Sequence, residues 1–127
     1  MLTMPKIKIC GLKSLDQILM INKYDVDYVG FIFAESKRKI TPDMAKEMKE
    51  KLRKDIKAVG VFVDSPIEEV NQITNYCNLD VVQLHGKETD IECSKSIVPV
   101  WKALSVKDKE VVELLEQYKT IEGFVLL

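Results

Sequence analysis

Short apolar segments alternate with amphipathic segments along the whole chain, and this alternation limits the fold more than any other feature of the sequence. Strict alternation of strands and helices is typical of a parallel sheet covered by helices and joined by right-handed crossovers. We therefore expect an α/β domain. The predicted strands are Lys6–Cys10, Tyr28–Phe33, Ala58–Val63, Asp80–Leu84, Val98–Ala103 and a sixth that begins at Gly123.

Helix start signals stand between these strands. A Ser or Thr followed three residues later by Glu or Gln predicts a capping box, and a proline after the cap fits the first helical position. We expect helices that begin at these signals, the second ending near Leu52 and the third near Tyr76, and a further charged helix over about 107–118. The signals are Ser14 with Gln17, Thr41 with Pro42, Ser65 with Glu68, and Thr89 with Glu92.

Two architectures fit this order of elements. The predicted strands recur at intervals of roughly 25 residues, and eight such units make about 200 residues, the compact end of the (β/α)₈ barrel range. A doubly wound open sheet can close at about the present length instead. The last residues, Phe124-Val125-Leu126-Leu127, read as a buried strand, and we expect the chain to be cut within it.

Composition and cysteine usage exclude several classes of protein. The chain has 127 residues, 46% apolar and 31% charged, with a net charge of −1, which gives no basic excess for nucleic acid. No apolar run is long enough to span a membrane. Cys10, Cys77 and Cys93 form no CxxC pair, so we expect no disulfide framework and no zinc site. Reduced thiols and a cytoplasmic location follow.

Ligands bind at the carboxyl ends of the strands in either architecture, so polar residues there are the candidates. Side chains alternate along a strand, which places Lys8 and Cys10 on one face while Ile7 and Ile9 pack on helices. A thiol beside an ammonium loses its proton more readily and can act as a base or nucleophile. The alternative is that Cys10 is a small buried apolar residue.

Three more candidates follow other strands. Gln83 and His85 share a face at the end of the fourth strand, although a single histidine is more often structural. Arg38 follows the second strand and is suited to a bidentate pair with a carboxylate, whereas Lys37 and Lys39 read as solvated charges. Asp64 follows the third strand and reads as a polar lead-in to the Ser65 cap.

Taken together, these segments resemble the phosphoribosylanthranilate isomerases of tryptophan biosynthesis. The resemblance runs in register from Lys6 to Leu127 and implies a (β/α)₈ TIM barrel. We then expect 1–127 to be one partial barrel domain, with units seven and eight and the end of unit six missing. The segments that carry the resemblance are Lys8-Ile9-Cys10-Gly11, Val29–Phe33, Ser36-Lys37-Arg38, Val59–Val63, Val81–Gly86 and Trp101-Lys102-Ala103.

The resemblance also implies a reaction, an Amadori rearrangement of a phosphorylated substrate that uses neither a cofactor nor a metal. Cys10 would be the general base, Arg38 would hold the anthranilate carboxylate, and Lys8, Gln83 and His85 would line the pocket. In the family, the general acid is an aspartate directly after the sixth strand, and the phosphate site follows strands seven and eight. Two minor departures from the family pattern are Lys13 and Lys39.

Since the acid and the phosphate site would lie beyond Leu127, we expect this chain alone to be inactive. A barrel with two strands missing would leave open sheet edges, and we expect it to associate with itself or with the missing fragment.

The alternative from another class is a receiver-like signalling domain with Asp64 as phosphoacceptor and Lys102 as its lysine. The chain has Cys10-Gly11 where such a domain needs a pair of acidic residues.

Overall fold

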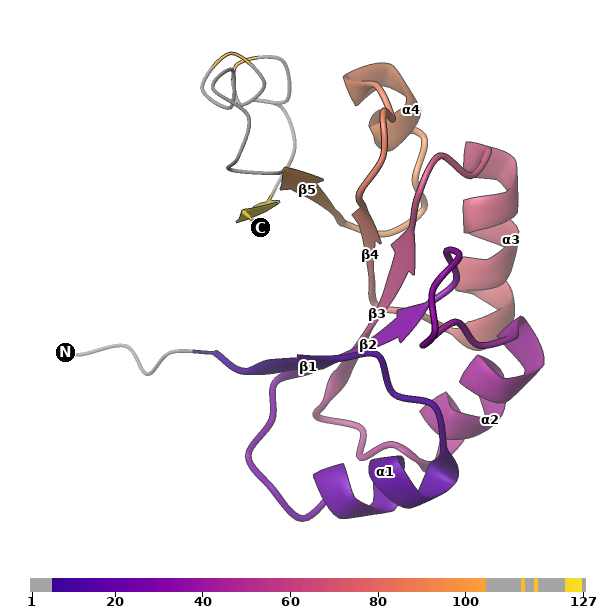
Figure 1. The fold of residues 1–127 in the computed structure, drawn as a ribbon, viewed down its shortest axis with the longest axis vertical. Helices are drawn as coiled ribbons and strands as arrows, with labels where there is room; N and C mark the ends of the chain where they lie inside the picture. Colours follow the sequence, from indigo (N-terminus) through magenta and orange to yellow (C-terminus); the bar gives the residue numbers. More distant parts are fainter. Residues whose placement is uncertain (1–5, 105–112, 114–115, 117–122, 127) are drawn as a thin grey trace, which may run out of the picture.

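Six strands form a single parallel sheet in the computed structural model, which describes residues 6–104, 113, 116 and, for the backbone, 123–126. Each strand pairs with the next one along the chain, so the order in the sheet is the order in the sequence (Figure 1). The strands are β1 (Lys8–Cys10), β2 (Tyr28–Ile32), β3 (Lys57–Phe62), β4 (Val81–Leu84), β5 (Val100–Leu104) and β6 (Gly123–Leu126).

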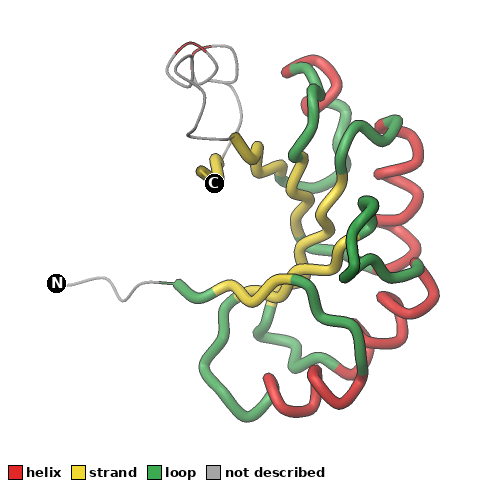
Figure 2. The backbone as a smooth tube through the Cα atoms, in the orientation of Figure 1, coloured by secondary structure: helices red, strands yellow, loops and turns green. Residues whose placement is uncertain are grey.

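Within the described part of the chain, four helices cover the outer side of this sheet (Figures 1 and 2). The charged helix predicted over 107–118 lies outside the described residues apart from positions 113 and 116. The four helices are α1 (Leu15–Ile21), α2 (Pro42–Lys51), α3 (Ile67–Cys77) and α4 (Asp90–Ser94).

Strand order and curvature select the barrel over the doubly wound sheet. Doubly wound folds reverse direction at a switch point, so their strands are not in sequential order, whereas those of a barrel are. The sheet also curls: the rings of Tyr28 on β2 and Trp101 on β5 meet edge to face with centroids 4.8 Å apart. Three strand spacings in a flat sheet would separate them by about 14 Å. The described residues therefore form a curled half-barrel with its helices outside (Figure 2).

The core lies between the sheet and the helices. Alternate strand residues point outward into it, among them Val29, Phe31 and Phe62, which are fully or almost fully buried. Ile18 of α1 and Met48 of α2 pack into the same core. The opposite side of each strand is left to face the barrel interior, which is where the predicted polar residues point.

Three of the four predicted helix caps are confirmed. Ser14 forms a capping box with Gln17, and the hydroxyls of Thr41 and Thr89 accept hydrogen bonds from the amides three residues on. The prediction for Ser65 is wrong. Helix α3 begins at Ile67, its N-cap is Pro66, and no side chain caps it.

The first and fifth strands also differ from prediction. Strand β1 begins at Lys8, and Ile7 and Ile9 are 51% and 37% exposed instead of packing on helices. Within the described sheet β1 pairs only with β2, so one flank of these side chains is open. Strand β5 begins after Pro99, two residues later than predicted, because proline has no N–H to donate to a sheet.

Candidate active site

A cavity of about 350 Å³ opens at the carboxyl ends of β1 to β4. Buried apolar side chains such as Ile32 and Val61 form part of its lining. All five residues predicted as catalytic or substrate-binding line it: Lys8, Cys10, Arg38, Gln83 and His85. The structure thus brings together side chains that are up to 77 positions apart in the sequence.

Strand alternation and register explain this convergence. Lys8 and Cys10 are two residues apart on β1, and Gln83 and His85 are two apart at the end of β4, so each pair shares a face. Gln83 lies opposite Val61 of β3, which also faces the cavity. The Lys8 ammonium donates a hydrogen bond to the Gln83 amide oxygen, which ties the first strand to the fourth across the barrel interior.

The thiol of Cys10 occupies space that a glycine leaves open. Cys10 pairs with Gly30 of β2, and a Cβ atom at Gly30 would lie 2.7 Å from the Cys10 sulfur. Such a contact is far shorter than a van der Waals contact between carbon and sulfur, so any larger residue would displace the thiol. Gly30 therefore belongs to the site although it carries no functional group.

Lys8 gives the cavity a positive charge beside the thiol. Burial lowers the pKa of its ammonium below the ordinary 10.5, while the charge of a Cys10 thiolate would raise it. The two groups therefore interact electrostatically within the cavity. The pair thus places a sulfur and an ammonium in one cavity at the end of β1.

Arg38 lies at the rim of the cavity, across the first loop. Its Nη1 donates to the carbonyl oxygen of Cys10 at 3.4 Å. Gly11 has a φ of +85°, which favours glycine. A Cβ atom at Gly11 would lie 2.6 Å from the Arg38 Cδ, so only glycine lets the Arg38 side chain pass over the backbone here. A guanidinium has five N–H donors and this contact uses one, which suits Arg38 to hold an anion.

Glu35 is the one acidic residue that lines the cavity within the described part of the chain. It is on the surface, and Lys39 lies 2.5 Å from its carboxylate. The hydrogen bond from Lys39, helped by the lysine charge, lowers the pKa of Glu35. A carboxyl group that is ionised near neutral pH cannot donate a proton, so Glu35 is poorly suited to be a general acid.

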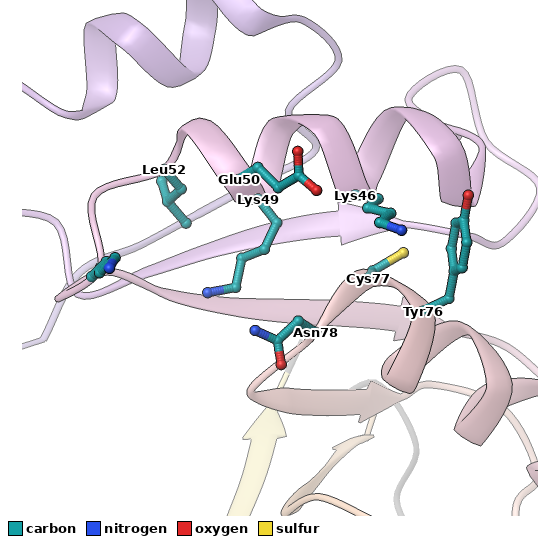
Figure 3. Close-up of a pocket in the computed structure, with 8 residues that line it drawn as sticks. Lys46, Lys49, Glu50, Leu52, Tyr76, Cys77 and Asn78 are labelled. Carbon is teal, nitrogen blue, oxygen red and sulfur yellow. The ribbon is translucent and has the colours of Figure 1, made fainter.

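A second groove, of about 330 Å³, lies between α2 and α3 on the outer side of the sheet (Figure 3). Its cysteine, Cys77, has a thiol whose pKa burial raises to about 11, and its Sγ donates to the Pro42 carbonyl oxygen at 3.2 Å. Two of its lysines are engaged as well: Lys46 lies over the Tyr76 ring and Lys49 pairs with Asp80. We take these groups as structural.

Two buried charged residues near the site were not identified as site residues from the sequence. Glu88 is 3% exposed, and the side chain of Lys102 is fully buried. The Lys102 ammonium nitrogen lies 2.6 Å from a carboxylate oxygen of Glu88. A signal for this pair is present in the sequence: Lys102 shares a strand face with Val100 and Leu104, and a lysine on an apolar face requires a buried partner.

The receiver-like interpretation is wrong. Lys102 is bonded to Glu88 and to the carbonyl oxygen of Gly86 on the outer side of the sheet. The Asp64 carboxylate accepts the amide of Lys87 at 2.5 Å instead of standing open to a phosphodonor. The sequential order of the strands also differs from that of a doubly wound receiver.

Comparison with known proteins decides the family. The family model described as N-(5'phosphoribosyl)anthranilate (PRA) isomerase matches residues 7–127. The chain belongs to this family. An N-(5'-phosphoribosyl)anthranilate isomerase of Thermoanaerobacter pseudethanolicus is 46% identical over 124 residues, which cover 96% of this chain and 60% of the relative. The chain thus spans about 60% of the length of the curated isomerases that it matches.

Solved isomerase structures confirm the fold. The phosphoribosyl anthranilate isomerase of Thermotoga maritima superposes with a TM-score of 0.91 at 33% identity, over 97% of this chain and 61% of that one. A phosphoribosyl anthranilate isomerase in complex with reduced 1-(o-carboxyphenylamino)-1-deoxyribulose 5-phosphate matches with a TM-score of 0.91 and 33% identity, over 97% and 64% of the two chains. The half-barrel therefore matches the corresponding part of the isomerase fold.

The described residues include neither a membrane-spanning helix nor a cluster of metal-binding side chains. No helix in this part of the chain combines the length and apolar character needed to cross a membrane. No three His, Cys, Asp or Glu side chains within it lie close enough together to hold a metal ion.

Proposed function

We propose that this protein isomerises N-(5'-phosphoribosyl)anthranilate to 1-(2-carboxyphenylamino)-1-deoxyribulose 5-phosphate, a step of tryptophan biosynthesis. One observation carries the proposal: in a chain of the isomerase family, a thiol, an ammonium, a guanidinium, an amide and an imidazole all line a single cavity at the carboxyl ends of the strands. The relative solved with a reduced 5-phosphate ligand supports a small phosphorylated substrate.

Cys10 is the general base in this proposal. A general acid first protonates the ribose ring oxygen, and the C1′–O bond breaks to give a Schiff base. The Cys10 thiolate then takes the proton from C2′, and the electrons of that C–H bond form the enolamine, which tautomerises to the amino-ketone. The half-buried Lys8 ammonium lines the same cavity and interacts electrostatically with Cys10.

The remaining residues of the cavity bind and orient the substrate. Arg38 holds the anthranilate carboxylate through its guanidinium at the rim. Gln83, fixed by Lys8, and His85 present polar groups to the sugar from β4. The scheme involves no net oxidation, so it needs no cofactor, and it includes no nucleic-acid or membrane partner. A cytosolic location, favoured by three free thiols, belongs to the same proposal.

The described residues supply a candidate base for this chemistry, but the acidic residue at their cavity is poorly suited to be the general acid. Glu35, the acidic residue at the cavity, is paired with Lys39 and has a lowered pKa. Loss of a general acid typically lowers a rate by about 10² to 10⁴. We therefore expect the 127-residue chain to show no measurable turnover by itself, with the acid provided by the part of the barrel that follows β6 in the family.

Two proteins test this proposal. One is chain 1–127. The other is a chimera in which 1–127 is joined to the part of the Thermoanaerobacter relative that the chain does not cover, about 40% of that protein. Freshly made phosphoribosylanthranilate is added and the decay of its fluorescence is followed. We expect no turnover by 1–127, turnover by the chimera, and a loss of about 10² to 10⁴ in the chimera with Cys10→Ala.

Other outcomes would contradict parts of the proposal. Turnover by 1–127 that disappears with Cys10→Ala would show that the chain holds its own acid. A chimera that folds but does not turn over would contradict the assigned activity, and a Cys10→Ala chimera with full activity would contradict the role of the thiol.

A further inference from the structure

We propose that the buried Glu88–Lys102 ion pair is a positioning device that holds the loop after β4, and with it His85, at the mouth of the cavity. The two residues contribute nothing to the cavity lining. An effect of Glu88 and Lys102 on catalysis depends on the proposed isomerase function. Their effect on the position of the loop can be measured without any assumption about that function.

The hydrogen bonds of Glu88 join two neighbouring loops. One carboxylate oxygen accepts the backbone amide of Asp64, after β3, at 2.8 Å. The other accepts the amide of Gly86, after β4, also at 2.8 Å. A carboxylate with two backbone N–H donors and a lysine is a strong, charge-assisted junction. Glu88 thus fixes the ends of β3 and β4 relative to each other.

Lys102 extends this junction to the fifth strand. Its ammonium lies 2.6 Å from the Glu88 carboxylate and donates to the Gly86 carbonyl oxygen at 2.5 Å. Gly86 is therefore held through both its N–H and its C=O. Residue 86 follows His85 directly, so the peptide units on both sides of Gly86, the first of which joins it to His85, are each held by a hydrogen bond.

Asp64, in the loop after β3, adds a further hydrogen bond to the loop after β4. Its backbone is left-handed, with a φ of +52°, and its carboxylate accepts the amide of Lys87 at 2.5 Å. The His85 amide donates to the Phe62 carbonyl oxygen at 2.9 Å. The segment from 85 to 87 is thus bonded at every residue to β3, to its loop, or to the ion pair.

The burial of the pair argues for a specific role. Two charges removed from water gain little net stability, because the desolvation cost offsets their attraction. A similar volume of apolar side chains would stabilise the core equally well. What apolar side chains cannot do is hold two amides and a carbonyl of the cavity loops in fixed positions, and this is what Glu88 and Lys102 do.

Amide hydrogen exchange on chain 1–127, followed residue by residue by NMR, tests the proposal. The variants are Glu88→Gln and Lys102→Met, and Lys49→Met is the control because Lys49 also pairs with a carboxylate but lies away from the cavity. We expect both variants to speed exchange at the Asp64 and Gly86 amides by at least about tenfold, as for loss of a hydrogen bond to a charged group. The β2 amides and the control should stay near wild-type rates.

Other exchange patterns would overturn the proposal. Unchanged rates at Asp64 and Gly86 would show that the pair does not hold the loops. Equal acceleration at these amides and in β2 would show a general contribution to folding instead. If a single variant fails to fold, the double variant Glu88→Gln/Lys102→Met leaves no unpaired buried charge, and the same comparison applies to it.

A kinetic cycle in the chimera tests whether the pair acts through His85. Lys102→Met should lower kcat/KM by about tenfold or more with His85 present. With His85→Ala it should have a clearly smaller effect, because residues that act as one unit are not additive. Fully additive effects would contradict the positioning role. A chimera that is inactive even with Glu88 and Lys102 intact would contradict the proposed function, while the exchange comparison still decides the role of the pair.

Discussion

At the scale of single residues, the three cysteines of the chain have two different environments. Cys10 is half-buried at a cavity and next to an ammonium. Cys77 and Cys93 are 1% and 4% exposed, and burial raises the pKa of each thiol. The thiolate is the reactive form, so the environment decides which cysteine can do chemistry.

Alkylation should separate these cysteines. With iodoacetamide at about pH 8, we expect Cys10 to react first, and Cys77 and Cys93 to react only as the protein unfolds. Peptide mapping by mass spectrometry over time checks this. Lys8→Met should slow the reaction of Cys10, since it removes the neighbouring cation, whereas Lys49→Met should not. Equal labelling of all three thiols in the folded chain would contradict the assignment of Cys10.

The raised pKa of Cys77 also gives a pH dependence with a definite sign. Between the ordinary value of 9.0 and about 11, the folded chain keeps a proton that the unfolded chain has lost. Stability contributed by this thiol is therefore full below about pH 9 and is lost as pH rises towards 11. Urea unfolding at about pH 8 and pH 10 should show a smaller loss of stability in Cys77→Ala than in the wild type.

At the scale of elements, local signals predicted where most helices begin, and the exception is informative. Thr41 caps α2 with its hydroxyl, 3.2 Å from the Met44 amide. Ser65 has an equivalent sequence signal but no capping bond, because α3 begins at Ile67 after Pro66. The left-handed Asp64 just before it is bonded to the β4 loop, so tertiary contacts shift the start of the helix.

The two residues form a matched pair for a stability measurement. Thr41→Ala should lower the free energy of unfolding by about 1 kcal/mol through loss of the cap. Ser65→Ala should change it by less than about 0.5 kcal/mol, as for a surface substitution without a specific contact. Urea titration followed by circular dichroism provides both values. Equal losses would mean that Ser65 acts as a cap in solution.

At the scale of the whole molecule, the described sheet is curled and open. Strands β1 and β6 each have one neighbour within the described residues, and Ile9 of β1 is 37% exposed. An unpaired strand edge with apolar side chains favours pairing with another chain. We therefore propose that chain 1–127 associates with itself through its edges.

Sedimentation velocity across a concentration series measures this association. We expect species larger than the monomer at micromolar concentration, and a clear loss of them with Ile9→Lys, because a charge on an edge strand disfavours pairing. Met20→Lys is the control, since Met20 is 63% exposed on α1 away from the edge. A single monomeric species at every concentration would contradict the proposal.

The sequence by itself determined the order of the elements, the inward faces of β1 and β4, and five of the residues that line the cavity. These depend on local rules: alternation along a strand puts Lys8 with Cys10 and Gln83 with His85, and glycine positions mark where the backbone turns. The resemblance to the isomerase family then supplied the roles that local rules left open, and the family model match confirms the family.

Periodicity alone left the barrel and the doubly wound sheet open, and the family resemblance favoured the barrel. The tertiary structure confirmed the barrel through the strand order, which is a property of long-range pairing that periodicity does not encode. It also revealed the Glu88–Lys102 pair and its bonds to two loops. A charged residue on an apolar strand face indicates that a buried partner exists. Which residue is the partner, and which backbone groups the pair also bonds, depends on packing between distant segments.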